Sequence, residues 1–153
     1  MSAPREVQPG EFYMVTRRCT QRQFLLRPDA GCRATFGYCL AVAAARTGVV
    51  VMLPVVLSNH HHVVVYDPEG RIAEFTGLLH GLVALAMNRA RRRAENFWAG
   101  ETPCNVRLAD REAVLALLVY AATNPVKDHL VALVHQWPGV HGLHDLLEHR
   151  AVH

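Results

Sequence analysis

The 153-residue chain predicts an α+β protein with the ferredoxin-like split β-α-β sandwich, an antiparallel sheet and an additional tyrosine-bearing helix toward its C-terminal end. Three observations lead to this class. The expected order of elements is strand, helix, strand, strand, helix, short strand and helix, which is the order of that sandwich. Two β-branched apolar runs adjoin each other in the middle of the chain. Long segments with apolar residues at helical spacing flank them.

The first part of the chain predicts one strand and one helix. "EFYMVTRR", residues 11–18, is β-prone and runs into the polar, arginine-bearing loop "RRCTQRQ". Asp29 is a suitable cap for a following helix, in which Phe36 and Leu40 begin an apolar face. Gly48 is expected to end this helix.

The middle of the chain predicts a hairpin and a second long helix. Residues 49–57 and 60–66 are nearly continuous apolar runs, and the polar "SN" pair between them turns the chain. Pro54 places the first of these strands at an edge or at a bulge. After the turn "DPEG", apolar residues line one side of a helix over 72–86, whose tail "NRARRRAEN" is strongly basic.

A short strand and a third helix are expected next. "FWAGETPCNVRLAD" is typical of a loop with a short strand, and "REAVLALLVYAATNP", residues 111–125, carries Val114, Leu117 and Ala121 at helical spacing. Pro125 is expected to end this helix, because the residue before a proline is driven out of helical geometry. Residues 126–153 show no clear pattern.

Length and composition favour one domain. With 153 residues, 51% of them hydrophobic, the chain can bury one core but not two, so we expect a single domain over 1–153 with its core at about 11–139. No apolar stretch is long enough to span a membrane, and the N-terminus lacks a signal-peptide pattern. We therefore expect a cytoplasmic protein without membrane contacts.

The basic side chains are almost all arginines. The net charge is +3, and Lys127 is the only lysine. The planar guanidinium of arginine suits bidentate binding of phosphate. The codon bias of a GC-rich genome would produce the same ratio, so this observation is compatible with a nucleic-acid partner without requiring one.

The stretch "SNHHHVVVYDP" places three histidines in an apolar strand, where unpaired imidazoles are costly to bury. Because side chains alternate along a strand, His60 and His62 share one face and His61 takes the other. Two neutral imidazoles on one face can hold a metal ion, but two ligands do not complete a site. The alternatives are a histidine-rich strand without a role and a structural zinc site, which no cysteine spacing supports.

The third helix offers a further ligand. Tyr120 and Asn124 are four residues apart, so their side chains are neighbours on the helix surface. They can face the same metal ion as the histidines. Alternatively, Tyr120 lies at the edge of the core and Asn124 is a helix stop before Pro125. The residues alone leave both interpretations open.

Together these motifs resemble a known family. "SNHHHVVV" resembles the histidine strand of the HUH endonucleases, and "LVYAATNPV" resembles the tyrosine helix of their single-tyrosine transposases, of the insertion-sequence type and its REP-associated relatives. "FYMVTRRCTQRQFLLRPD" and "MNRARRRAENFW" also look like that family, and the resemblance runs from about Phe12 to Gly139. The chain departs from the family pattern at three places. His61 stands where the family usually has a hydrophobic residue, and the glycine often found before the tryptophan stretch is missing. "WPGVHGLHD" stands where the family has paired serines after the tyrosine helix.

The resemblance implies a transposase: a metal-dependent single-stranded DNA endonuclease and strand transferase that cleaves through a 5′-phosphotyrosine intermediate. Tyr120 matches the nucleophile, and His60, His62 and Asn124 match the metal ligands. The implied cofactor is Mg²⁺ or Mn²⁺. The implied partner is single-stranded or hairpin DNA, with a homodimer as one arrangement, in a bacterial cytoplasm where the protein associates with the nucleoid when it binds DNA.

We also expect the arginines of two segments to contact DNA phosphates and Trp98, beside Phe97, to stack a base. The predicted phosphate contacts are Arg17, Arg18, Arg22, Arg89, Arg91, Arg92 and Arg93. The alternatives are a solvated helix end for the arginine run and core anchors for the two aromatic residues.

Two other functions are compatible with the sequence. A relaxase or replication initiator shares the histidine strand, but the tyrosine followed by "NPV" favours a transposase. A catalytically silent, domesticated DNA-binding protein would not need Tyr120 together with both histidines. An RNA-recognition module would need exposed aromatic residues on two central strands, and the strands here supply only Tyr66.

Overall fold

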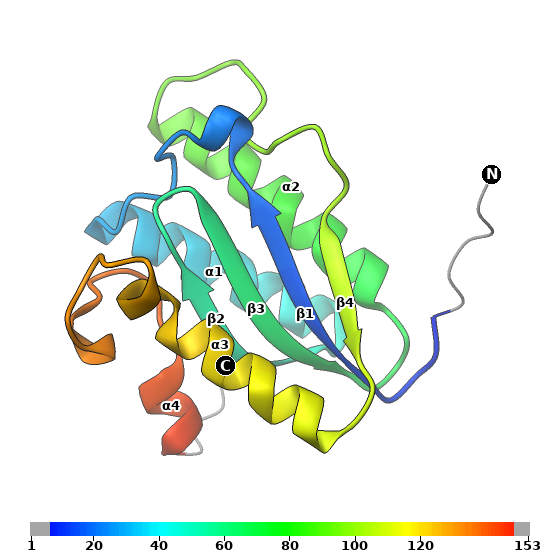
Figure 1. Cartoon of the computed structure of the whole chain (residues 1–153). Coiled ribbons are helices and arrows are strands. Elements are labelled where there is room, and N and C mark those ends of the chain that lie inside the picture. The colour runs from blue at the N-terminus through cyan, green and yellow to red at the C-terminus, as the bar shows by residue number, and fades with distance from the viewer. Residues whose placement is uncertain (1–6, 149–153) are drawn as a thin grey trace.

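A four-stranded antiparallel sheet with the order β2-β3-β1-β4 forms the centre of the computed structural model, which describes residues 7–148 (Figure 1). The strands are β1 (Glu11–Arg18), β2 (Val50–Val56), β3 (His60–Asp67) and β4 (Cys104–Leu108). The helices are α1 (Ala30–Thr47), α2 (Ile72–Ala90), α3 (Arg111–Lys127) and α4 (Leu143–Leu147), with short 3-10 turns η1 (Thr20–Arg22) and η2 (Val134–Gln136). This topology confirms the predicted ferredoxin-like class.

The sheet separates two cores. Helices α1 and α2 cover one face, and their apolar side chains pack with Val15, Val63 and Val65 of the central strands. Helix α3 covers the other face, where Val64 and Leu53 pack against Ala121. Alternation along β3 therefore sends successive side chains into different cores.

Polar caps set the ends of the two long helices. Asp29 accepts a hydrogen bond from the backbone nitrogen of Cys32 (2.7 Å) at the start of α1, and Gly48 ends that helix with φ = 75°, as both were predicted to do. Asp67, fully buried at the end of β3, accepts bonds from the backbone nitrogens of Arg71 and Ile72 (both 2.9 Å). This carboxylate satisfies two of the free N–H groups at the start of α2.

The edge strand β2 is irregular and covered. Its register with β3 shifts between Val51 and Leu53, just before Pro54, which confirms the prediction of an edge strand with a bulge. Residues 137–142 then cover its outer side: Val56 donates from its backbone nitrogen to Val140, and Gly142 donates to Pro54 (both 2.9 Å). The segment that had no sequence pattern thus protects a strand edge from other chains.

The prediction that Pro125 ends the third helix was wrong. Helix α3 continues through Pro125 to Lys127, and the backbone nitrogen of Asp128 still bonds to the carbonyl of Asn124 (2.9 Å). A proline in the last turn removes little more than one backbone bond, and the burial of the Pro125 side chain offsets that loss. The extra turn keeps Asn124 inside the helix.

No helix among residues 7–148 is both long enough and apolar enough to cross a membrane.

The cap at Asp67 yields a stability prediction. Asp67→Ala should lower the free energy of unfolding by about 3 kcal/mol, because the backbone nitrogens of Arg71 and Ile72 lose their carboxylate acceptor at a buried position. Urea unfolding followed by circular dichroism measures the change. Glu69→Ala, at an exposed residue of the same turn, is the control and should change stability by less than about 0.5 kcal/mol. Equal effects of the two substitutions would contradict the assignment.

Candidate active site

Four side chains that the sequence singled out meet on the sheet face that α3 covers. They are His60, His62, Tyr120 and Asn124. The ring centres of the two histidines lie 5.1 Å apart, and those of His62 and Tyr120 lie 5.7 Å apart. The amide nitrogen of Asn124 lies 3.3 Å from His62 Nε2. One chain supplies all four groups, so their arrangement requires no second copy.

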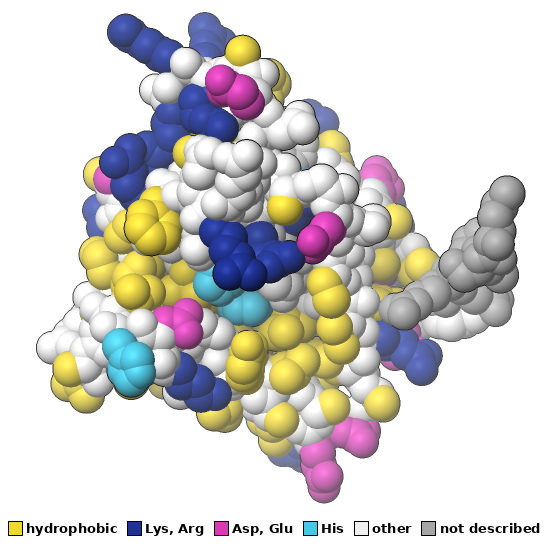
Figure 2. Space-filling view, turned by 45° about the horizontal axis from the view of Figure 1, so that its top comes forward, with side chains coloured by type: hydrophobic (Ala, Val, Ile, Leu, Met, Phe, Trp, Pro, Cys, Tyr) yellow, Lys and Arg dark blue, Asp and Glu magenta, His cyan; other side chains and the backbone are white. Residues whose placement is uncertain are grey.

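The side chains of the site differ in their exposure to solvent. His62 and Asn124 are buried, whereas Tyr120 is 41% exposed. Figure 2 shows histidine side chains at the surface, between positively charged side chains and a band of hydrophobic ones. The phenol of Tyr120 is therefore open to a large substrate, while the groups beside it are held by the protein.

Hydrogen bonds fix the orientation of both imidazoles. His60 Nδ1 lies 2.7 Å from Asn59 Oδ1, an acceptor, so this nitrogen carries the proton and Nε2 keeps a free lone pair. His62 Nε2 accepts from the amide of Asn124, so its Nδ1 donates to the hydroxyl of Thr16 (2.9 Å). Both rings thus have the tautomer that offers Nε2 as a metal ligand.

This donor set suits a divalent cation. A half-turn of the Asn124 amide would replace its nitrogen with its oxygen, giving two imidazole nitrogens and one amide oxygen. Burial lowers the pKa of His60 and lowers that of His62 to about 4, so both rings are neutral at pH 7, the form that binds metal. Residues 7–148 contain no group of three His, Cys, Asp or Glu side chains that could hold a metal ion, and Asn124 is the residue beside the two imidazoles that could add a third donor.

Comparison with known proteins gives a match in structure alone. No protein-family model and no curated protein matches the sequence. A REP-associated tyrosine transposase bound to a REP hairpin matches with a TM-score of 0.78, over 97% of this chain and 86% of that chain, at 16% identity. This chain has the fold of a REP-associated tyrosine transposase. A protein of Deinococcus radiodurans R1 described as a candidate transposase matches with a TM-score of 0.54, over 78% of this chain and 95% of that chain, at 17% identity.

Within this transposase fold, His61 belongs to the core. It is fully buried on the opposite face of β3, where its Nε2 lies 2.9 Å from His80 Nε2, so one ring donates and the other accepts. The rings of Phe36 and Trp98 stand at 5.3 and 5.6 Å from His61. His61 therefore does not compete with its neighbours for a metal ion.

Three of the predicted DNA-binding arginines are exposed near the site. Arg18 is the β1 partner of His60 in the sheet register, and its guanidinium pairs with Glu101 at 2.7 Å. Arg22 and Arg92 are exposed beyond the end of β1. The exposed ion pair of Arg18 is weak, and the side chains of Arg22 and Arg92 make no ion pair within residues 7–148, so all three guanidinium groups are available to a phosphate backbone.

Arg91 and Arg93 are placed differently from the prediction. Their side chains are only 15% and 16% exposed. Arg91 donates from Nε to the carbonyl of Leu25 (2.9 Å), and Arg93 donates to Asn88 Oδ1 (3.1 Å). Arg91 ties the end of α2 to the loop at Leu25, and Arg93 bonds back to α2, so both guanidinium groups already have partners within the fold.

Trp98 is also not available to a base. It is 7% exposed, its Nε1 donates to the carbonyl of His80 (2.8 Å), and its ring packs beside Phe97. The guanidinium of Arg17 lies over the same ring at 5.6 Å. The burial of Trp98 therefore favours its core interpretation over the stacking one. The side chain of Arg17 packs on the same ring.

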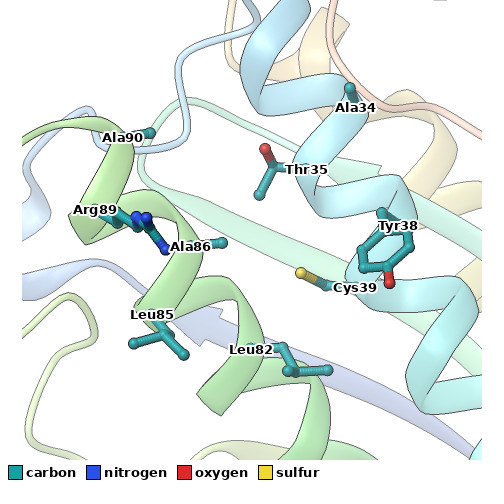
Figure 3. Close-up of a pocket in the computed structure, with 9 residues that line it drawn as sticks. All are labelled: Ala34, Thr35, Tyr38, Cys39, Leu82, Leu85, Ala86, Arg89 and Ala90. Atoms are coloured by element: carbon teal, nitrogen blue, oxygen red, sulfur yellow. The ribbon is translucent and has the colours of Figure 1, made fainter.

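Arg89 lies away from the four central residues. It lines the α2 side of a groove of about 800 Å³ between α1 and α2, together with Leu85, and Tyr38 lines the α1 side (Figure 3). These helices cover the sheet face opposite α3. Arg89 can therefore meet DNA only if the substrate extends beyond the α3 face.

The buried histidine pair predicts a pH-dependent stability. Burial, with a smaller effect of Arg17, lowers the pKa of His80 from 6.5 to about 3, so below pH 6.5 the unfolded chain takes up a proton that the folded chain does not. The contribution of neutral His80 to the free energy of unfolding is fully present above pH 6.5 and is lost toward pH 3. For His80 alone, the free energy of unfolding should fall by about 2 kcal/mol between pH 7 and pH 5.

Urea unfolding at pH 5, 6 and 7 tests this dependence. The double variant His61→Leu/His80→Leu should show a clearly shallower pH dependence than the wild type, because neither ring remains to be protonated. The exposed His135→Leu is the matched control and should leave the dependence unchanged. If the free energy of unfolding of the double variant decreases with pH as steeply as that of the wild type, the buried histidine pair is not the source of the dependence.

Proposed function

We propose that this protein is a transposase that cleaves and rejoins single-stranded DNA through a covalent 5′-phosphotyrosine on Tyr120. The observation that carries the proposal is the position of Tyr120. Its exposed ring lies 5.7 Å from the ring of His62, which has His60 and Asn124 as neighbours, and both imidazoles carry their proton on Nδ1. A nucleophile next to such a donor set is the arrangement that metal-assisted phosphoryl transfer needs.

DNA is the substrate we propose, in single-stranded or hairpin form. The REP-associated transposase of the same fold is bound to a REP hairpin. In this chain, Arg18 and Arg22 are exposed at the end of β1, and Arg92 follows α2. These groups supply the positive charge that a phosphate backbone requires.

The chemistry divides among the four central residues. His60, His62 and Asn124 would hold Mg²⁺ or Mn²⁺, which when bound stabilises the charge on the scissile phosphate. The bond from Tyr120 Oη to phosphorus forms as the bond from phosphorus to the 3′ oxygen breaks. The phenol loses its proton and the leaving 3′ oxygen gains one. The phosphotyrosine conserves the bond, so another 3′-hydroxyl can attack it and rejoin strands.

Lys127 supports the nucleophile in this proposal. Its ammonium lies 4.8 Å from the centre of the Tyr120 ring, in cation–π geometry. The contact restrains the ring in the free protein. It also puts a positive charge beside the phosphate that Tyr120 attacks.

The covalent intermediate gives the main test. Incubation with 3′-labelled single-stranded hairpins and Mn²⁺ should yield a protein–DNA band that survives denaturation, because the 5′ phosphate of the labelled fragment remains on Tyr120. Tyr120→Phe should abolish the band, and Tyr38→Phe, at an exposed tyrosine on α1, should keep it. A band in Tyr120→Phe would contradict the assignment. Binding of hairpins by the wild type without any band would indicate a silent DNA-binding protein.

Lys127 can be tested in the same assay. Lys127→Met should slow adduct formation at saturating DNA about fivefold, because it removes about 1 kcal/mol of charge stabilisation. Lys127→Arg should keep most of the rate, since a cation remains over the ring. A matched loss of charge at the exposed Arg107, Arg107→Met, should leave the rate unchanged. Equal rates for Lys127→Met and the wild type would remove Lys127 from the mechanism.

A further inference from the structure

An apolar groove on the helical layer, opposite the candidate active site, has no part in the proposed chemistry. The groove of about 800 Å³ lies between the first half of α1 and the second half of α2 (Figure 3). All of its lining residues except Arg89 are uncharged. Two of them, Leu85 and Tyr38, are 72% and 71% exposed, the highest values among the large hydrophobic side chains of residues 7–148. Exposed apolar surface of this kind marks an interaction site.

The sequences of both helices indicate that their outer faces are covered. The inner face of α1 packs in the core through Phe36 and Leu40. Residues 34–45 of this helix nevertheless contain no Asp, Glu, Lys or Arg, although Tyr38 is exposed. Residues 75–88 of α2 contain none either. A surface helix normally carries charged residues on its outer face, and one that is apolar all round packs against other elements on both sides.

The charges beside the groove are positive. Arg89 lines it, and the guanidinium of this residue makes no hydrogen bond or ion pair within residues 7–148. Arg33 is exposed on α1, next to the lining residue Ala34. It donates from Nη1 to the carbonyl of Pro138 (2.7 Å), so its other N–H groups remain available. The groove therefore has an apolar lining beside two arginines.

The carboxylates of the helical layer already have partners. Helix α1 contains no Asp or Glu, and the single one in α2, Glu74, accepts two bonds of 2.8 Å from Arg71 at the other end of that helix. Asp29, before α1, caps that helix and lies 3.6 Å from the guanidinium of Arg91. A second copy of this face would therefore place arginines against arginines. The charge favours an acidic partner over a homodimer.

We propose that the groove binds an amphipathic helix of another protein, whose apolar side chains lie between α1 and α2 and whose Asp or Glu residues pair with Arg89 and Arg33. The α2 lining runs from Leu82 to Ala90, about 12 Å along the helix axis, which matches two to three turns of a partner helix. A concave groove fits a helix better than a flat lipid surface. Because the groove lies on the face opposite α3, the partner can bind without covering Tyr120.

Photo-crosslinking in the native cells tests which molecule covers the groove. The full chain would carry p-benzoylphenylalanine in place of Tyr38. It should crosslink to a protein segment that has apolar residues at helical spacing with Asp or Glu beside them. Leu85→Glu and Ala34→Glu, one on each side of the groove, should each abolish the crosslink, because a carboxylate repels the acidic helix and interrupts the apolar surface. Leu115→Glu, at an exposed leucine of α3, is the matched control and should keep it.

A charge reversal tests the chemistry of the contact. A labelled peptide with the sequence of the crosslinked segment should bind the wild type in fluorescence anisotropy, and Arg89→Glu should weaken its binding about tenfold. Replacing the acidic residues of the peptide with lysine should weaken binding to the wild type and restore binding to Arg89→Glu. Arg46→Glu, at an exposed arginine near the other end of α1, should leave the affinity unchanged.

Several results would overturn the inference. They are a crosslink to a second copy of this chain, to lipid or to DNA, no crosslink at all, or a crosslink that both groove variants retain. Sedimentation of the wild type, but not of Leu85→Glu, with phosphatidylglycerol vesicles would assign the groove to a membrane surface instead. A peptide affinity that Arg89→Glu does not change would remove the acidic partner. The covalent band on Tyr120 is measured separately, so neither proposal depends on the other.

Discussion

The candidate site depends on the alternation of side chains along β3. His60 and His62 face α3, and His61, between them, faces α1 and α2. The middle ring is buried against His80 and Trp98, and this packing fixes the depth and rotation of the strand. Its two neighbours are therefore held on the other face with little freedom. The packing of His61 in one core thus helps to position His60 and His62, its neighbours on β3, at the candidate site on the other face.

Helix α3 must lie correctly on the sheet for the site to exist. Ala121, on the buried side of α3, packs in the core. His141 Nε2 bonds to the carbonyl of Ala122 (2.9 Å), which ties the C-terminal segment to the helix. The same segment covers β2 through Val56 and Pro54. Contacts distant from the chemistry therefore determine where Tyr120 stands, as expected when reacting groups must be positioned closely.

Local patterns predicted much of the fold, and tertiary contacts account for what they missed. The cap at Asp29 depends on neighbours in sequence, as does the alternation of the histidines, and both predictions were confirmed. Helix α3 passes Pro125 because burial outweighs a local preference. Trp98 and the internal arginines find partners that only the folded chain provides. Thr16 orients His62, but its role becomes visible only when the pairing of β1 with β3 is known.

The most direct test of the account is the binding of Mn²⁺ to the protein without DNA. Electron spin echo spectroscopy of the bound ion should show nitrogen couplings from two imidazoles, because His60 and His62 both offer Nε2 to the site. His62→Gln should remove one coupling and weaken binding, while His135→Gln should change neither. Mn²⁺ that binds without imidazole couplings, or equally well when both His60 and His62 are replaced by glutamine, would contradict the proposed metal site.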